Sequence, residues 1–165
     1  MSPIEQALLT WIHLISAAIW VGGSLFIGVV FSPLLKTMTD SIEERLQIMI
    51  KVGKRFNKIA VPSLIILMGT GLYSSHVLLG KPDLLFLTSY GTFLVIKIIL
   101  VIALIITYIV HVRVIRKDVE EKIMSRQMPQ DQIQKLRKKI IILGEVTVVL
   151  SVAILLFASL LDAGV

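Results

Sequence analysis

The sequence contains no cysteine, and this absence excludes several kinds of site at once. Disulfide bonds, thiolate metal sites, iron–sulfur clusters and covalently attached c-type haem all need cysteine sulfur. Charged residues are also scarce, at 17% of the chain, whereas 56% of the residues are hydrophobic and the mean hydropathy is +0.89. A water-soluble domain of 165 residues would expose far too much apolar surface at this composition. The composition therefore predicts an integral membrane protein.

Long hydrophobic runs take up most of the chain. A helix needs about 20 apolar residues to cross a bilayer, and runs of that length lie at residues 7–31, 59–80, 90–112 and 140–161. No Lys or Arg precedes the first run, which is also too long for the apolar core of a signal peptide. The loops, at residues 32–58 and 113–139, are too short for a soluble domain. We therefore expect a single membrane domain, 1–165, that is all-α and forms an antiparallel bundle of four transmembrane helices.

Basic residues are distributed unevenly along the chain. Of the 17 Lys and Arg residues, 15 fall in the two long loops, and only Lys81 and Lys97 lie elsewhere. The positive-inside rule then predicts that both loops are cytoplasmic and both termini outside, in the cytoplasmic membrane. We expect the basic loops to set this topology and to contact anionic lipid rather than nucleic acid. Helical spacing also predicts an amphipathic helix over residues 40–56, lying along the cytoplasmic surface.

Lys97 lies inside one of the most apolar stretches of the chain, residues 92–110. A Lys at the centre of a membrane helix costs about 2.5 to 3.5 kcal/mol, so it usually faces the bundle interior and has a partner. Counting from the outer edges of their spans at 1.5 Å per residue, His13 lies about 9 Å deep, Lys97 about 10 Å and His76 about 6 Å. We therefore predict an outer group made of His13, His76 and Lys97.

Helical spacing gives each span one face that carries its polar residues. On the first span this face carries His13 and Trp20, and on the third it carries Lys97, Tyr108 and His111. A bundle with a functional interior is expected to turn these faces inward.

The same spacing on the second span aligns Ile65 and Leu72 with His76, and on the fourth it aligns Leu156 with Glu145. These two faces are also expected to point inward.

Near the cytoplasmic ends of the third and fourth spans, His111 and Glu145 are candidates for a second, inner pair. His76 and His111 are also close enough to the membrane edges to be ordinary interfacial residues. Glu145 could instead pair with a basic residue at the loop ends. The sequence leaves these alternatives open.

Two segments resemble signatures of the copper resistance protein D (CopD) family. Residues 13–23 (HLISAAIWVGG) resemble its first-span signature, and residues 90–97 (YGTFLVIK) resemble a second one, in which Tyr-Gly precedes a Lys. Weaker likenesses lie at residues 69–73 (GTGLY) and at Glu145. The resemblance implies a protein of copper uptake or resistance that acts with an extracytoplasmic copper or redox partner.

The chain is also similar to the HemJ-type protoporphyrinogen oxidases, a related four-helix family. That family pairs a first-span His with a third-span Lys in haem binding and activity, which implies such roles for His13 and Lys97. The chain departs from the HemJ pattern after Trp20, because residues 31–35 (FSPLL) lack the Arg and the further His expected there. The sequence therefore leaves open whether the chain is an enzyme, such as a haem-dependent oxidoreductase.

The ligands that haem b and copper need help to choose between them as the cofactor. Haem needs axial imidazoles, which His13 and His76 could supply, and cations near its propionates, where Lys97 fits. Copper(I) prefers sulfur ligands with imidazole, but the chain has no Cys and its only mid-span Met is Met68. A copper ion on the two His residues would also lie beside a second cation, Lys97.

We therefore predict a haem b protein of electron transfer or porphyrin redox chemistry, with a copper-binding protein as the alternative. Residues predicted to bind the cofactor are His13, His76, Lys97, Trp20 and Tyr90, with His13 and His76 also as metal ligands. Further candidates are Tyr108, His111 and Glu145. The sequence does not decide the number of cofactors or the substrate. It also does not decide the oligomeric state, and it is compatible with a homo-oligomer.

Overall fold

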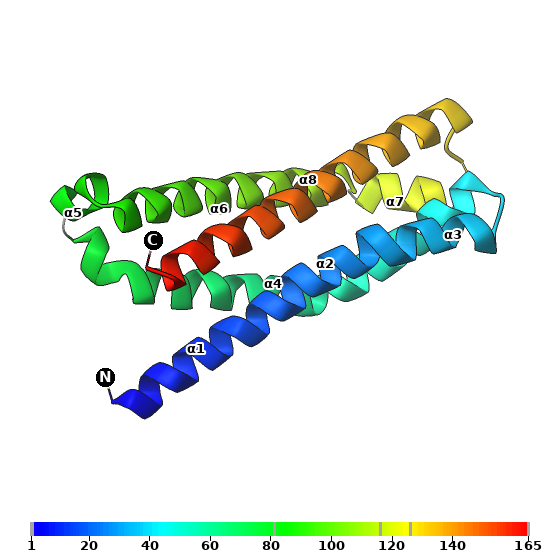
Figure 1. Cartoon of the computed structure of the whole chain (residues 1–165). Coiled ribbons are helices and arrows are strands. Elements are labelled where there is room, and N and C mark those ends of the chain that lie inside the picture. The colour runs from blue at the N-terminus through cyan, green and yellow to red at the C-terminus, as the bar shows by residue number, and fades with distance from the viewer. Residues whose placement is uncertain (1, 81, 116, 126, 165) are drawn as a thin grey trace.

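The computed structural model describes residues 2–80, 82–115, 117–125 and 127–164. The basic residues Lys81, Arg116 and Arg126 lie outside these ranges. Within them, four helical segments are long and apolar enough to cross a membrane: Pro3–Met38, Ile42–His76, Ser89–Val114 and Gln130–Asp162. The segments run antiparallel beside one another (Figure 1). The predicted helical membrane fold with four spans is confirmed.

The first span is one continuous helical rod that contains two π-helical turns. Its elements are α1 (Pro3–Ala17), η1 (Ala18–Gly22), α2 (Gly23–Leu25), η2 (Phe26–Phe31) and α3 (Ser32–Met38). The rod begins in a capping box, in which Ser2 and Glu5 each accept a hydrogen bond from the other's backbone N–H. The π-helical turns place Trp20 in η1 and Gly28 in η2. Such turns add a residue to the helix locally and occur frequently at functional sites.

The second span is part of a much longer helix, α4 (Ile42–Leu79). Its 38 residues make it about 57 Å long, whereas the hydrocarbon core of a bilayer is about 30 Å thick. The helix continues through Pro62, so the segment 42–58 and the predicted second span, 59–80, are parts of one helix as far as Leu79. The prediction that residues 40–56 form a helix is confirmed, but the prediction that this helix lies along the membrane surface is wrong.

The third and fourth spans and two short helices complete the bundle. After α5 (Pro82–Leu87), the third span is α6 (Ser89–Val114), which begins where Thr88 Oγ1 accepts a hydrogen bond from the Gly91 N–H at 3.0 Å. A short helix, α7 (Lys117–Met124), then leads to the fourth span, α8 (Gln130–Asp162), which begins directly after Pro129.

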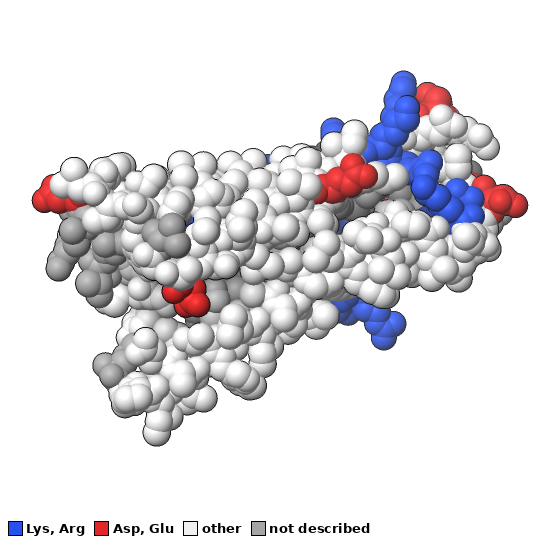
Figure 2. Space-filling model, in the orientation of Figure 1, with Lys and Arg blue, Asp and Glu red and all other residues white. Residues whose placement is uncertain are grey.

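The two ends of the bundle differ in charge. The start of α1 and the end of α8 lie at the same end as α5, while α3 and α7 lie at the other (Figure 1). Lys and Arg side chains gather at the end with α3 and α7 (Figure 2). We call this the basic end, and the positive-inside rule predicts that it is cytoplasmic.

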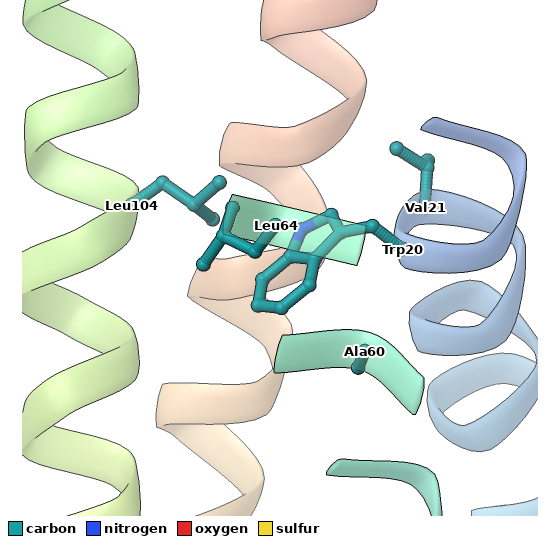
Figure 3. Close-up of a cluster of buried hydrophobic side chains, with 5 residues drawn as sticks. All are labelled: Trp20, Val21, Ala60, Leu64 and Leu104. Carbon is teal, nitrogen blue, oxygen red and sulfur yellow. The ribbon is translucent and has the colours of Figure 1, made fainter. Parts of the chain in front are cut away.

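The middle of the bundle is closed around Trp20, whose side chain is only 2% exposed. It reaches from the first span toward Ala60 and Leu64 of α4 and toward Leu104 of α6 (Figure 3). The indole Nε1–H donates a hydrogen bond to Ser151 Oγ of α8 at 3.1 Å. Trp20 therefore contacts all three of the other spans.

A second buried cluster lies at the basic end of the bundle. We call it the basic-end cluster, and it consists of Leu46, Ile50, Ile123, Ile133 and Ile140. These side chains come from α4, α7 and α8. Gln47 Nε2 also donates a hydrogen bond to the Ile123 carbonyl at 2.8 Å. The apolar face of segment 42–58 is thus buried against protein, which explains why α4 does not bend onto the membrane surface.

The predicted inward faces of the second and fourth spans are wrong. Ile65 and Leu72 are 63% and 60% exposed, and Leu156 is 58% exposed, so these side chains face the surroundings of the bundle. The buried residues of these spans are mostly small, and they are Ala60, Ser63, Thr147 and Ser151, together with Leu64 and Ile140. Small residues pack between membrane helices while large aliphatic ones face lipid, so alignment with His76 and Glu145 at helical spacing did not identify the buried residues of these spans.

Candidate functional site

The His13 ring is fixed by a hydrogen bond between the first and second spans. Its Nδ1 lies 2.6 Å from Oγ1 of Thr70 on α4. The Thr70 hydroxyl also lies 2.7 Å from the Ile66 carbonyl, to which it can donate its single proton. In that arrangement the Thr70 oxygen accepts the Nδ1–H of His13, and Nε2 keeps a lone pair that can bind a metal or a proton donor.

The other predicted members of the outer group are placed differently. Lys97 lies near enough to His13 for the two side chains to interact electrostatically. His76 is exposed, its Nδ1 is within hydrogen-bond distance of the Tyr73 carbonyl, and its ring lies 5.3 Å from the Tyr73 ring. No contact described in the structure joins His76 to His13. Tyr90, at the start of α6, is 45% exposed.

Lys97 has no carboxylate within ion-pair distance among the described residues. Its side chain is partly buried in a span whose other residues are almost all apolar. An anionic partner from outside the chain would offset the cost of this charge.

A cavity of about 450 Å³ lies between the four spans, in the half of the bundle toward the basic end. Residues of every span line it, including Trp20, Ser24, Gly28, Met49, Asn57, Tyr108, His111, Glu145 and Val148. Trp20 and Tyr108 form an edge-to-face pair on its wall, with their ring centroids 5.2 Å apart. A mostly apolar cavity with a few polar groups is the usual form of a small-ligand site.

Four polar side chains of this cavity come from α4, α6 and α8, and they are Asn57, Tyr108, His111 and Glu145. Tyr108 and His111 are three residues apart on α6 and therefore share a face. The His111 ring packs beside Gly144 of α8, where an added Cβ would lie 3.8 Å from its Cε1. No hydrogen bond or ion pair among the described residues uses the side chains of Asn57, Tyr108, His111 or Glu145. These four groups are therefore available to a ligand.

His111 and Glu145, predicted as an inner pair, thus line the same cavity. Tyr108 and Trp20, also predicted as site residues, line it with them. The structure therefore divides the predicted residues into two places, with His13 and Lys97 in one and these four in the other.

Sequence reasoning missed Thr70, Met49 and Asn57. Thr70 lies within the segment 69–73 that had already been singled out, and a mid-span Thr is a ready partner for a neighbouring His. Nothing in the sequence indicated that Met49 and Asn57 would line a cavity, because that depends on α4 being one continuous helix from Ile42 to Leu79.

The described residues contain no group of three or more His, Cys, Asp or Glu side chains placed to hold a metal ion. The thioether sulfur of methionine is a further ligand for soft metal ions such as copper(I).

Comparison with known proteins identifies the family of this chain. A family model described as "CopD: Copper resistance protein D" matches residues 50–161. The match covers Lys97 and the cavity residues on α6 and α8, whereas His13 and Trp20 lie before it.

A protein of Aquifex aeolicus (strain VF5), described as "Uncharacterized protein", is 34% identical over 97 residues. The alignment covers 57% of this chain and 64% of the relative, which is less than two thirds of the relative's length. No solved structure matches the chain.

Proposed function

Because this chain belongs to the copper resistance protein D family, we propose that it binds copper in the membrane and passes it across. We place the ion in the cavity at the basic half of the bundle. The observation that carries this placement is that Met49 and His111, from two different helices, line one cavity together with Glu145. Copper is the cargo in this proposal.

The three side chains suit copper(I) by their chemistry. Thioether and imidazole are ligands that copper(I) prefers. Glu145, an exposed residue on the cavity lining, adds one negative charge that balances the single positive charge of the ion. The nearest basic side chain on the lining, Lys54, is paired with Glu120 of α7 and does not oppose the ion directly.

The predicted outer site is less suited to copper. His13 offers one imidazole nitrogen, but Lys97 acts on it electrostatically and would repel a metal cation while it is charged. No described contact joins His76 to His13, so His76 does not supply a second imidazole ligand beside His13.

Metal loading of the purified protein tests the proposal. Wild-type protein in detergent, incubated with copper(I) under reducing conditions and then desalted, is expected to retain about one copper per chain. His111→Ala and Glu145→Gln are each expected to lower the affinity at least tenfold, measured by competition with a chromophoric copper(I) chelator.

The matched control is His76→Ala, which removes an exposed imidazole outside the cavity and should leave the affinity unchanged. Wild-type protein that retains no copper, or an affinity that follows His76 instead of His111, would contradict the proposal.

A second candidate function is haem b binding near His13, with electron transfer or porphyrin redox chemistry. The observation that favours it is Lys97, a charged group in a membrane span with no carboxylate partner in the described chain. A haem propionate would supply that partner, and His13 Nε2 is free to bind iron.

An absorption spectrum tests this candidate. Protein expressed with ample haem should show a Soret band that His13→Ala abolishes and Thr70→Val weakens. A spectrum without a Soret band would exclude the haem candidate and leave the copper proposal untouched.

A further inference from the structure

The cavity between the four spans has an opening between η2 and α8. Val29 of η2 and Val149 of α8 both line the cavity and are 64% and 66% exposed, so they border this opening. The two helices lie close together beside it, since a Cβ added to Gly28 would lie 3.7 Å from Val148 Cγ2. All four residues belong to segments that can span a membrane, so the opening is expected to face lipid rather than water.

Toward the middle of the bundle, aromatic side chains close the cavity. Trp20 is 2% exposed, and its ring meets the Tyr108 ring edge to face at a centroid distance of 5.2 Å. Phe56 of α4 adds a third ring to the lining. The volume of about 450 Å³ is large for a single metal ion and is typical of a site for a small organic molecule. A molecule that enters from lipid and reaches these rings must be apolar over most of its surface.

Two hydrogen-bond donors face this cavity from different helices. The Tyr108 hydroxyl comes from α6 and the Asn57 amide from α4. Neither side chain takes part in a hydrogen bond among the described residues. A ligand with two separate hydrogen-bond acceptors could therefore satisfy both donors at once.

The charges on the described lining favour a neutral ligand. Besides His111, the titratable side chains there with a charge at neutral pH are Lys54 of α4 and Glu145 of α8. Lys54 is paired with Glu120 of α7, whereas Glu145 has no described ion pair and would repel a fatty-acid carboxylate or a lipid phosphate. A charged organic ligand would also have to cross hydrocarbon to reach the opening, which is costly.

We infer that this cavity binds the ring of a membrane quinone. Its two carbonyl oxygens accept hydrogen bonds from Tyr108 and Asn57, and its apolar tail leaves through the opening between η2 and α8. A quinone ring is flat, neutral and soluble in lipid, and its carbonyls lie on opposite sides of the ring, which suits donors on two helices. The inference does not rest on the copper proposal, because Tyr108 and Asn57 are not among the proposed copper ligands.

Fluorescence of Trp20 tests the inference, because a quinone beside an indole quenches its emission. The chain has two Trp residues, so Trp11→Phe leaves Trp20 as the only one. In this background, titration with decyl-benzoquinone in detergent should quench the emission saturably. Tyr108→Phe and Asn57→Leu should each raise the Kd about tenfold through the lost hydrogen bond. Tyr90→Phe, which removes a hydroxyl from the same helix outside the cavity, is the matched control and should leave the Kd unchanged.

A further pair of variants tests the opening itself. Gly28→Leu puts a side chain into the opening and should abolish the saturable quenching. Gly22→Leu is the control, because Gly22 lies outside the cavity and an added Cβ there meets nothing within 4 Å. Quenching that does not saturate, or that is equal in all these variants, would show only partition into detergent and would overturn the inference.

Decylbenzene distinguishes recognition of the ring from binding of the tail, because it carries the same tail and no carbonyl. It should compete poorly with decyl-benzoquinone. Competition at equal concentrations would show that the cavity takes up any apolar chain, and would overturn the inference. Protein that binds no copper but shows the saturable quenching would overturn the proposed copper function alone.

Discussion

The indole Nε1–H of Trp20 donates a hydrogen bond to Ser151 Oγ, 3.1 Å away, and so joins the first span to the fourth. Ser151 is 1% exposed and in turn donates to the Thr147 carbonyl at 2.8 Å. Both donors are therefore satisfied in the middle of the bundle, where water is absent. Because Trp20 also packs against α4 and α6, this bond fixes the residue around which all four spans meet.

Ser151→Ala is expected to lower the stability of the protein by about 1 kcal/mol, because it leaves the Trp20 N–H unpaired in an apolar interior. The measurement is thermal unfolding in detergent, followed by helical circular dichroism. Ser159→Ala, on an exposed position of the same helix, is the control and should melt like wild type. Equal melting of the two variants would show that the bond contributes nothing.

Gly23→Ala should destabilise the bundle through Phe56. An added Cβ would lie 2.2 Å from Cε2 and 2.6 Å from Cζ of the Phe56 ring, so the ring must move. Overpacking of this kind costs about 1 to 3 kcal/mol. A Cβ at the neighbouring Gly22 would meet nothing within 4 Å, so Gly22→Ala is the matched control.

The test for Gly23 is a double-variant cycle in thermal unfolding. Phe56→Leu should remove most of the penalty of Gly23→Ala, because the ring is the obstacle. A penalty that persists in the Phe56→Leu background would point to backbone strain in the π-helical turns instead.

Lys97→Met is expected to stabilise the protein without cofactor by about 1 kcal/mol or more, since it removes a charge from a membrane span in which no described carboxylate pairs with it. The readout is again thermal unfolding, with Lys36→Met at an exposed position of α3 as the control. Copper affinity should stay unchanged, because Lys97 does not line the cavity. A lower melting temperature would instead reveal a bound partner of Lys97.

Single-cysteine labelling tests the orientation, and the chain suits it because no native cysteine interferes. Ala163→Cys and Ser125→Cys place a thiol at exposed positions at opposite ends of the bundle. In intact cells whose inner membrane is reached by a membrane-impermeant maleimide, the Ala163→Cys variant should be labelled and the Ser125→Cys variant should not. The reverse pattern would invert the predicted topology.

The spans and the inward faces of the first and third helices could be predicted from the sequence. Length and hydropathy are enough to locate membrane helices, and Trp20 and Leu104 are buried where helical spacing places them. The faces of the second and fourth helices could not be found in the same way. In lipid both faces of a span are apolar, and burial depends on which face carries small residues such as Ala60 and Ser63.

The candidate site was predicted only in part, for a related reason. Depth along each span predicts one group with His13 and Lys97 and another with His111 and Glu145, and the last two line one cavity. Depth did not show that His76 is exposed, because depth says nothing of rotation about the helix axis. The position of Met49 on the cavity lining could not be predicted either, because it depends on α4 being one continuous helix from Ile42 to Leu79.

The continuity of α4 from Ile42 to Leu79 has a mechanical consequence. Ala60 and Leu64 of α4 belong to the cluster around Trp20, while Leu46 and Ile50 of the same helix belong to the basic-end cluster. Because α4 is one continuous helix, a tilt of α4 as a whole would move side chains in both clusters. A rearrangement around Trp20 that tilts α4 would therefore also displace α7, because Gln47 of α4 is hydrogen-bonded to the Ile123 carbonyl of α7.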